Sequence, residues 1–198
     1  MPSTFDYLQL LAAKITNELV ISTIAGISME WRELKHRDGN LYGVYMTGAT
    51  SFAVGLAVAL PHRRVISLEG DGSILMGLSI LPVIAQQNPS NLVVIVFDNE
   101  LYAAAGKVPS FTAGLTNLVE IVRGAGIKNT KLVRQLSEFQ EAIDEAFQAS
   151  SASFITVKVE MPSKPRPFLK AAYAQIENKY RFIRYIEQTE NLQIIRSI

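Results

Sequence analysis

The chain has 198 residues, of which 48% are hydrophobic and 19% are charged, and its formal net charge is +1. This composition and length are typical of a folded globular domain, and a charge so close to zero argues against nucleic-acid binding, which needs a basic excess. The sequence has no cysteine and only two histidines, which excludes disulfides and thiolate sites, favours oxygen ligands for any metal, and fits a cytoplasmic location.

The first predicted element is an amphipathic helix within residues 1–19. Charged residues interrupt its apolar positions, which argues against a signal peptide. Two uncharged stretches, 41–61 and 72–97, contain glycine, proline and polar side chains too often for a helix that spans a membrane. We therefore expect buried strands and helices in these stretches, and no association with a membrane.

Short apolar runs rich in β-branched residues predict four strands, at 19–24, 65–68, 92–97 and 154–159. Their continuous apolar character is typical of parallel strands that helices cover on both faces. Helices are predicted between and beside them, at 48–60, 74–87, 117–124 and 137–149, the last with Ser137 as its candidate N-cap. This order predicts an α/β fold, a doubly wound three-layer sandwich around a mainly parallel sheet.

Prolines at 162, 165 and 167 interrupt the pattern after the last strand, and residues 170–190 then predict a charged helix. We expect residues 1–160 to form one domain and residues 161–198 to form a helical C-terminal extension. From Lys158 onward the chain has eight basic and four acidic residues, which is more typical of a solvated tail than of a basic binding patch.

Polar residues follow two consecutive predicted strands. Residues 69–73, Glu-Gly-Asp-Gly-Ser, follow one strand, and residues 98–101, Asp-Asn-Glu-Leu, follow the next. Because parallel strands end at the same edge of a sheet, we expect Asp71 and Asn99 to lie side by side. Carboxylate and amide oxygens suit Mg²⁺ or Ca²⁺, and Mg²⁺ often completes its shell with phosphate oxygens and water.

The glycines of the first turn fit a phosphate ligand. Gly70 and Gly72 allow the backbone to turn sharply and approach a ligand, and Ser73 with the first amides of the next helix would face an anion. Alone, Gly-Asp-Gly more often marks a tight turn with an aspartate N-cap. The Asp-Asn pair that follows after 25 residues makes a cation and diphosphate site the better interpretation.

Together, Gly-Asp-Gly and the Asp98-Asn99 pair resemble the cofactor-binding signature of the thiamine diphosphate enzymes. From about residue 19 to residue 160 the chain is similar to the diphosphate-binding part of the sulfopyruvate and phosphonopyruvate decarboxylases. The resemblance implies the thiamine diphosphate-binding fold, with Mg²⁺ held by the Asp71 carboxylate, the Asn99 side-chain oxygen and the Leu101 main-chain carbonyl. The cofactor site it implies comprises Met46, Gly70, Asp71, Gly72, Ser73, Asn99, Leu101 and Tyr102.

Several positions depart from the pattern that the resemblance implies. Met46 falls where the family has a bulky apolar residue that supports the bent thiamine, although core filling would explain a methionine equally well. Val44 and Thr47 stand where glycines usually flank that residue. Asp98 replaces the more common asparagine, and Lys107 lies in a loop where the decarboxylases have a Thr-Gly-Gly-Gln-like stretch.

The family's catalytic glutamate belongs to a separate pyrimidine-binding domain, for which this chain leaves no room. We therefore expect no catalytic residue here. The resemblance implies the diphosphate- and magnesium-binding subunit of a thiamine diphosphate-dependent 2-oxoacid decarboxylase, inactive alone, with a pyrimidine-binding (alpha-type) partner subunit and a homodimer when isolated. The alternatives are a carboligase or lyase subunit that acts on another 2-oxo acid, and a non-catalytic module that binds thiamine diphosphate.

Overall fold

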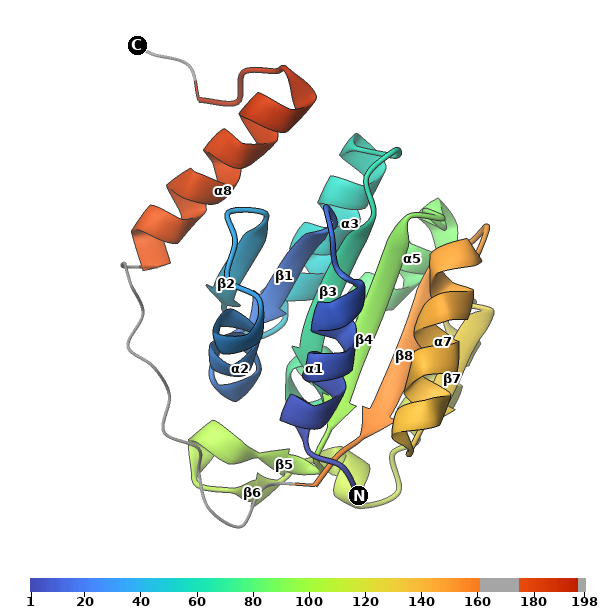
Figure 1. The fold of residues 1–198 in the computed structure, drawn as a ribbon. Coiled ribbons are helices and arrows are strands. Elements are labelled where there is room, and N and C mark those ends of the chain that lie inside the picture. Colours follow the sequence, from blue (N-terminus) through green and yellow to red (C-terminus); the bar gives the residue numbers. More distant parts are fainter. Residues whose placement is uncertain (161–174, 196–198) are drawn as a thin grey trace.

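The fold is a six-stranded parallel sheet between two layers of helices (Figure 1). The computed structural model describes residues 1–160 and 175–195. The strand order is β2-β1-β3-β4-β8-β7, and every pairing is parallel. The bounds are β1 (Leu19–Thr23), β2 (Asn40–Val44), β3 (Val65–Gly70), β4 (Leu92–Asp98), β7 (Asn129–Val133) and β8 (Ser153–Lys158). This arrangement confirms the predicted doubly wound α/β class.

Helices cover both faces of the sheet. One face carries α1 (Thr4–Lys14), α2 (Gly26–Leu34) and α7 (Leu136–Gln148), which lie in front of the sheet in Figure 1. The other face carries α3 (Gly48–Ala59), α4 (Asp71–Met76), α5 (Ile80–Gln87), α6 (Leu118–Gly124) and α8 (Gln175–Glu190). A two-stranded hairpin, β5 (Leu101–Tyr102) with β6 (Val108–Pro109), lies beyond β4, with short 3-10 turns at Ala103–Ala105 and Phe111–Ala113.

The apolar strands form two cores because successive side chains point to opposite faces. In β4, Leu92, Val94 and Val96 join the core under α3 and α5, whereas Val93, Ile95 and Phe97 join the core under α1 and α7. Every residue of β4 is buried. Burial on both faces explains why the run is continuously apolar instead of alternating.

The described residues differ from the sequence prediction at several elements. The strands β2 and β7 and the helix α2 were not predicted individually. The predicted helix 74–87 is two helices, α4 and α5, because the chain turns at residues 77–79. The predicted N-cap Ser137 is also wrong, since the capping box of α7 is formed by Gln135 and Glu138.

The helix α8 packs against the edge strand β2, so the prediction of a solvated tail is wrong for this part of the chain. Phe182 and Ile186 are buried in the core under α3. Asn178 is also buried and bonds the outer edge of β2: its Oδ1 accepts from the Tyr42 amide at 2.8 Å, and its Nδ2 donates to the Asn40 carbonyl at 2.9 Å. Residues 161–174 lie outside the described residues, so the division at 160 stays a prediction.

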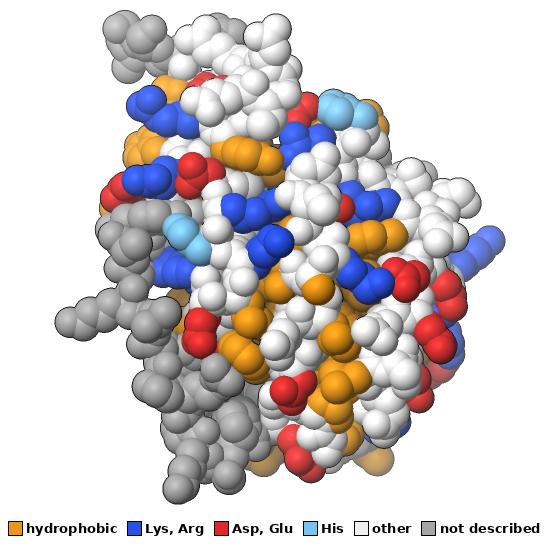
Figure 2. All heavy atoms as spheres, in the orientation of Figure 1, with side chains coloured by type: hydrophobic (Ala, Val, Ile, Leu, Met, Phe, Trp, Pro, Cys, Tyr) orange, Lys and Arg blue, Asp and Glu red, His pale blue; other side chains and the backbone are white. Residues whose placement is uncertain are grey.

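The molecular surface is mixed in charge where Figure 2 shows it, with acidic and basic side chains interspersed over α1, α2 and α7. In the part of the chain that the structure describes, no helix is long and apolar enough to cross a bilayer.

Backbone strain lies at the carboxyl edge of the sheet, where the strand ends meet. Positive φ angles occur at Ala25 after β1, at Thr47 before α3, and at Glu100 and Lys107 beyond β4. Thr47 has φ 73° and ψ −19°, a left-handed conformation that is costly for a β-branched residue.

Thr47→Gly is therefore expected to raise the free energy of unfolding. Relief of the left-handed strain contributes roughly 1–2 kcal/mol, and the greater freedom of glycine in the unfolded chain offsets about half of it, leaving a gain of about 0.5–1 kcal/mol. Urea unfolding measures this gain. Thr47→Ala keeps a Cβ and serves as the control; if both variants are equally stable, the strain at Thr47 is not what limits stability.

Candidate functional site

The candidate site is centred on Asp71, the first residue of α4, directly after β3. Its side chain is 2% exposed. Its Oδ2 accepts hydrogen bonds from the hydroxyls of Ser110 and Thr112, the latter at 3.0 Å. Both hydroxyls come from the segment that returns after the β5-β6 hairpin, so this segment folds over Asp71. In the described part of the chain, both side-chain hydrogen bonds to this carboxylate fall on Oδ2 and none on Oδ1.

A second buried carboxylate, Asp98, stands beside Asp71. The register pairs Gly70 with Phe97, so the two aspartates follow adjacent strand residues. The Thr112 hydroxyl lies 2.8 Å from Asp98 Oδ1 as well as 3.0 Å from Asp71 Oδ2. Because a hydroxyl has one proton, Thr112 can donate to only one of them at a time. The carboxylates therefore have more accepting capacity than these hydroxyls can satisfy.

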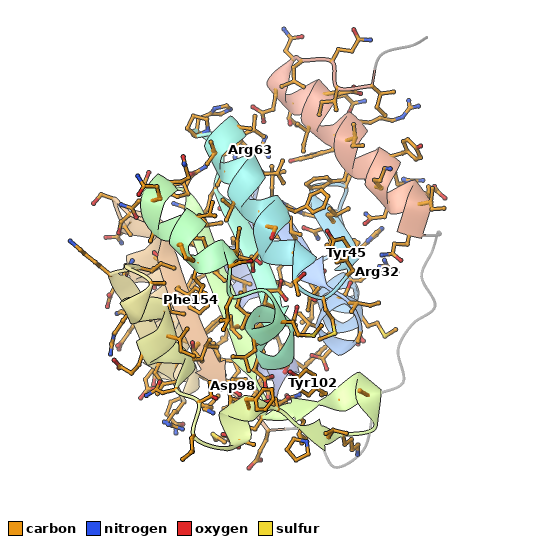
Figure 3. All side chains as sticks on the ribbon, turned by 180° about the vertical axis from the view of Figure 1, so that it is seen from behind. Arg32, Tyr45, Arg63, Asp98, Tyr102 and Phe154 are labelled. Atoms are coloured by element: carbon orange, nitrogen blue, oxygen red, sulfur yellow. The ribbon has the colours of Figure 1, made fainter. Side chains whose placement is uncertain are left out.

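Lys158, the last residue of β8, is the cation that reaches Asp98. Its Nζ lies 2.8 Å from Asp98 Oδ2 and 2.7 Å from Glu100 Oε1. Burial acts to lower the pKa of Lys158, but hydrogen bonds and attraction to Asp98 and Glu100 outweigh it, so the pKa of this ammonium is raised. Lys158 is therefore charged at neutral pH. Figure 3 shows Asp98 and Tyr102 at the same end of the sheet as the hairpin.

The turn after β4 is closed by its own side chains. Asn99 Oδ1 accepts from the Leu101 amide at 3.0 Å, and Asp98 Oδ1 accepts from the Glu100 amide at 3.2 Å. Glu100, between them, has a φ of 62°. The Glu100 carbonyl accepts from the Ser110 amide at 2.9 Å, which ties the turn to the segment that covers Asp71. Two of the three expected metal ligands, Asn99 and Leu101, are thus held in one rigid turn.

The charge balance of this site fits a bound cation. Asp98 is paired with Lys158, whereas Asp71 has no cationic partner among the residues that the structure describes. Burial and the nearby Asp98 charge raise the pKa of Asp71, although the Ser110 and Thr112 hydroxyls oppose the shift. In residues 1–160 and 175–195, no group of three acidic or imidazole side chains is placed so that it could hold a metal ion by itself. A cation here would therefore need amide, carbonyl and ligand oxygens besides Asp71, which is a donor set that suits Mg²⁺.

Only one of the two glycines in the Gly-Asp-Gly turn has a steric reason to be a glycine. A Cβ on Gly72 would lie 2.3 Å from Cε1 of Tyr102, so the Tyr102 ring packs directly on the glycine backbone. A Cβ on Gly70 would meet nothing closer than 3.8 Å. The structure therefore explains Gly72 by the close approach of Tyr102. It gives no steric reason for Gly70.

A buried polar cluster joins the start of α4 to the end of β1 and to the start of α3. Ser73 Oγ accepts from the Thr47 amide at 2.9 Å and lies 3.3 Å from Thr23 Oγ1. Glu69 Oε1 accepts from the Thr50 amide at 3.1 Å and so caps α3. The Glu69 side chain is fully buried, and burial raises its pKa. Ser73, expected to face an anion, is thus already bonded to the turn before α3.

Met46 lies in the turn between β2 and α3, next to the exposed Tyr45. Its side chain is half-buried and belongs to neither core cluster. Its role in supporting thiamine, which the resemblance implies, stays a prediction. Gly106 and Lys107 lie in the hairpin loop, where Lys107 has a φ of 61°.

Sequence reasoning missed four residues of this site: Glu69, Ser110, Thr112 and Lys158. Ser110 and Thr112 are separated from Asp71 by 39 and 41 residues, and Lys158 is 60 residues from Asp98. A signal was present for Glu69 and Lys158, since both are charged residues at the ends of apolar strands. For the two hydroxyls, the irregular loop carries no pattern that indicates where it folds.

The comparisons with known proteins identify the family of the chain and its fold. The family model described as "Thiamine pyrophosphate enzyme, C-terminal TPP binding domain" matches residues 37–157. The sulfopyruvate decarboxylase subunit beta of Methanocaldococcus jannaschii is 32% identical over 159 residues, which cover 79% of this chain and 84% of that protein. The phosphonopyruvate decarboxylase of Streptomyces viridochromogenes is 27% identical over 185 residues, which cover 91% of this chain and 46% of that protein.

Among solved structures, the thiamine diphosphate-dependent 4-hydroxybenzoylformate decarboxylase of Rhodococcus jostii RHA1 superposes with a TM-score of 0.70. The match covers 82% of this chain at 22% identity, and it covers 33% of the decarboxylase, so this chain spans about a third of that protein. At this identity the likeness shows the fold alone. It confirms that the α/β sandwich is the fold found in thiamine diphosphate-dependent enzymes.

Glu69→Gln is expected to stabilise the chain at neutral pH by about 1–3 kcal/mol, the order of the desolvation penalty of a buried polar group, because glutamine removes a carboxylate whose charge is disfavoured by burial. Because the folded pKa of Glu69 is raised above its unfolded value of 4.5, the wild-type chain loses stability as pH rises from that value through the folded pKa. Glutamine does not titrate. The difference between the two proteins should therefore widen upward from about pH 4.5, as urea unfolding at several pH values would measure.

The matched control for this prediction is Glu120→Gln on the exposed side of α6, which should show no such widening. A constant difference between Glu69→Gln and the wild type at every pH would contradict the assignment.

Proposed function

Because the chain belongs to the thiamine pyrophosphate enzyme family, through its C-terminal TPP binding domain, we propose that it binds thiamine diphosphate with Mg²⁺ at the ends of β3 and β4. The observation that carries this proposal is the buried Asp71 carboxylate, which has no cationic partner in the described structure and shares the Thr112 hydroxyl with Asp98, the residue before Asn99. Asp71 through Oδ1, the Asn99 side-chain oxygen and the Leu101 carbonyl would hold the metal. Asp71 Oδ2 stays bonded to Ser110 and Thr112, which fixes the carboxylate's orientation.

The remaining site residues would bind and orient the cofactor. The backbone of Gly70 and Gly72 and the start of α4 at Ser73 would receive the diphosphate, since amides at a helix start attract anions. Tyr102 would support the turn through its contact with Gly72. Met46 would support the thiamine from the turn before α3. When bound, thiamine diphosphate supplies the carbon nucleophile and electron sink for reactions of 2-oxo acids.

We propose that the reaction is the decarboxylation of a small 2-oxo acid. The relatives named sulfopyruvate decarboxylase subunit beta and phosphonopyruvate decarboxylase support this reaction class. Residues 1–160 would form the cofactor-binding domain and residues 161–198 an extension. The cysteine-free sequence supports a cytoplasmic enzyme.

A pyrimidine-binding, alpha-type subunit would complete the active site. Neither glutamate near Asp71 is free to act as the family's proton relay, because Glu69 caps α3 and Glu100 pairs with Lys158. The name "subunit beta" of the archaeal relative supports a separate partner chain. Exposed apolar side chains gather in the loops at the carboxyl edge, where the partner would cover them: Ile24, Tyr45, Met76, Phe111 and Leu115. In the isolated chain, a second copy would cover part of this surface.

Asp71→Ala is expected to weaken Mg²⁺-dependent binding of thiamine diphosphate by about 100-fold or more, because the loss removes a metal ligand and leaves the diphosphate charge uncompensated. Titration calorimetry with and without MgCl₂ measures the change, and chelation of the metal should abolish binding to the wild type. Asp144→Ala removes an exposed carboxylate on α7 and should bind like the wild type. Unchanged affinity of Asp71→Ala would refute the site.

The purified chain alone is expected to decarboxylate none of sulfopyruvate, phosphonopyruvate and simple 2-oxo acids, because it lacks the proton-relay glutamate. Activity should appear when the alpha-type subunit is added. Carbon dioxide release and product analysis measure the reaction and identify the substrate. Robust turnover by the chain without any partner would overturn the proposal of a shared active site.

A further inference from the structure

The ammonium of Lys158 contacts the residues on both sides of Asn99. Its Nζ lies 2.8 Å from Asp98 Oδ2 and 2.7 Å from Glu100 Oε1. We propose that Lys158 is a positioning residue, a clamp that holds the turn 98–101 in the geometry that presents Asn99 and Leu101 to a divalent cation. This inference rests on the proposed function, because the cation is the one proposed there.

The strand pairing places Lys158 for this contact. Lys158 is the Cα partner of Asp98 in the register of β4 with β8, and the Val159 amide donates to the Asp98 carbonyl at 3.0 Å. The Lys158 side chain is 14% exposed, so its ammonium is shielded from water more than that of a surface ion pair. The clamp therefore originates from a rigid strand and not from a loop.

The turn needs a clamp because its local conformation is unfavourable. Glu100 has a φ of 62°, a left-handed conformation that costs about 1–2 kcal/mol for a residue with a side chain. About half of the Glu100 side chain is exposed, so packing alone does not fix it. The ion pair with Lys158 fixes it at one end, while the bond from the Ser110 amide fixes its carbonyl.

The second contact of Lys158 allows Asp98 to be buried and to organise the turn. A buried carboxylate needs a cation or several hydrogen bonds. Lys158 binds Asp98 Oδ2, and Asp98 Oδ1 accepts from the Glu100 amide at 3.2 Å and from Thr112 Oγ1 at 2.8 Å. Through Thr112 the same network reaches Asp71. Lys158 is thus connected to both halves of the proposed metal site, although it is not one of the proposed ligands.

A positioning role and a purely electrostatic role of Lys158 predict opposite changes in Mg²⁺ affinity when the ammonium is removed. An ammonium near a cation site repels the cation, so loss of its charge alone would strengthen Mg²⁺ binding. Loss of the clamp would instead weaken Mg²⁺ binding, because the Asn99 and Leu101 oxygens would no longer be held in place. Groups that orient ligands in this way typically contribute 10- to 100-fold to metal affinity. The sign of the change therefore separates the two roles.

The first experiment measures the clamp with no ligand present. Lys158→Met should speed amide hydrogen exchange at Glu100 and Leu101 by about tenfold or more, while the amides of β3 and the core of β4 keep their protection. Lys131→Met, which removes an ion pair between β7 and Glu145 of α7, is the matched control and should leave this turn unchanged. Unchanged exchange at Glu100 and Leu101 in Lys158→Met would overturn the inference.

The second experiment measures the Mg²⁺ concentration that half-saturates binding of thiamine diphosphate, with the chain assembled with its partner. Lys158→Met should raise this concentration about 10- to 100-fold, and Lys158→Arg, which keeps a cation and its donors, should recover most of the affinity. Equal or tighter Mg²⁺ binding by Lys158→Met would overturn the inference. If the wild type bound no thiamine diphosphate, the proposed function would fail, and the exchange experiment would still decide whether Lys158 clamps the turn.

Discussion

Parallel pairing of β3 with β4, in the register that sets Gly70 opposite Phe97, brings Asp71 and Asp98 to neighbouring positions at the carboxyl edge of the sheet. Their shared contact with Thr112 fixes the returning loop, and the pairing of β4 with β8 supplies Lys158 from the next strand. Each strand contributes one part of the site through backbone hydrogen bonds that do not depend on the side chains of the site. The sheet therefore positions Asp71, Asp98 and Lys158, and the loops supply the remaining residues of the site.

The backbone strain of this arrangement is concentrated in the loops at the carboxyl edge of the sheet. Of the six described residues other than glycine with positive φ, four lie in the loops at the carboxyl edge: Ala25, Thr47, Glu100 and Lys107. Strained conformations persist where surrounding contacts determine them, and they are frequent at functional sites. Here the contacts are visible, since Thr47 donates its amide to Ser73 and Glu100 is held by Lys158. The two hydrophobic cores between the sheet and its helices therefore stabilise a fold whose loops have locally unfavourable backbone conformations.

The central strands could be predicted from the sequence because burial on both faces requires unbroken apolar runs such as residues 92–97, and the Gly-Asp-Gly and Asp-Asn turns stand out because they directly follow such runs. The missed strands β2 and β7 are the two edges of the sheet, where polar residues such as Asn40 and Lys131 are tolerated and the apolar signal weakens. Within the site, the candidate ligands, which directly follow strands, were predicted. Their supports were not, because Thr112 reaches Asp71 over 41 residues and Lys158 reaches Asp98 over 60 residues, and no local pattern encodes such contacts.

The amide side chains of α8 act on β2 as a neighbouring strand would. Asn178 satisfies the Tyr42 amide and the Asn40 carbonyl, and Gln175 donates to the Gly43 carbonyl. The backbone groups that β2 presents outward are thus occupied at three positions. An open parallel edge is a template on which another chain can add a strand, which is a route to aggregation. By occupying these groups with side-chain amides, α8 blocks the addition of a strand at the β2 edge of the sheet.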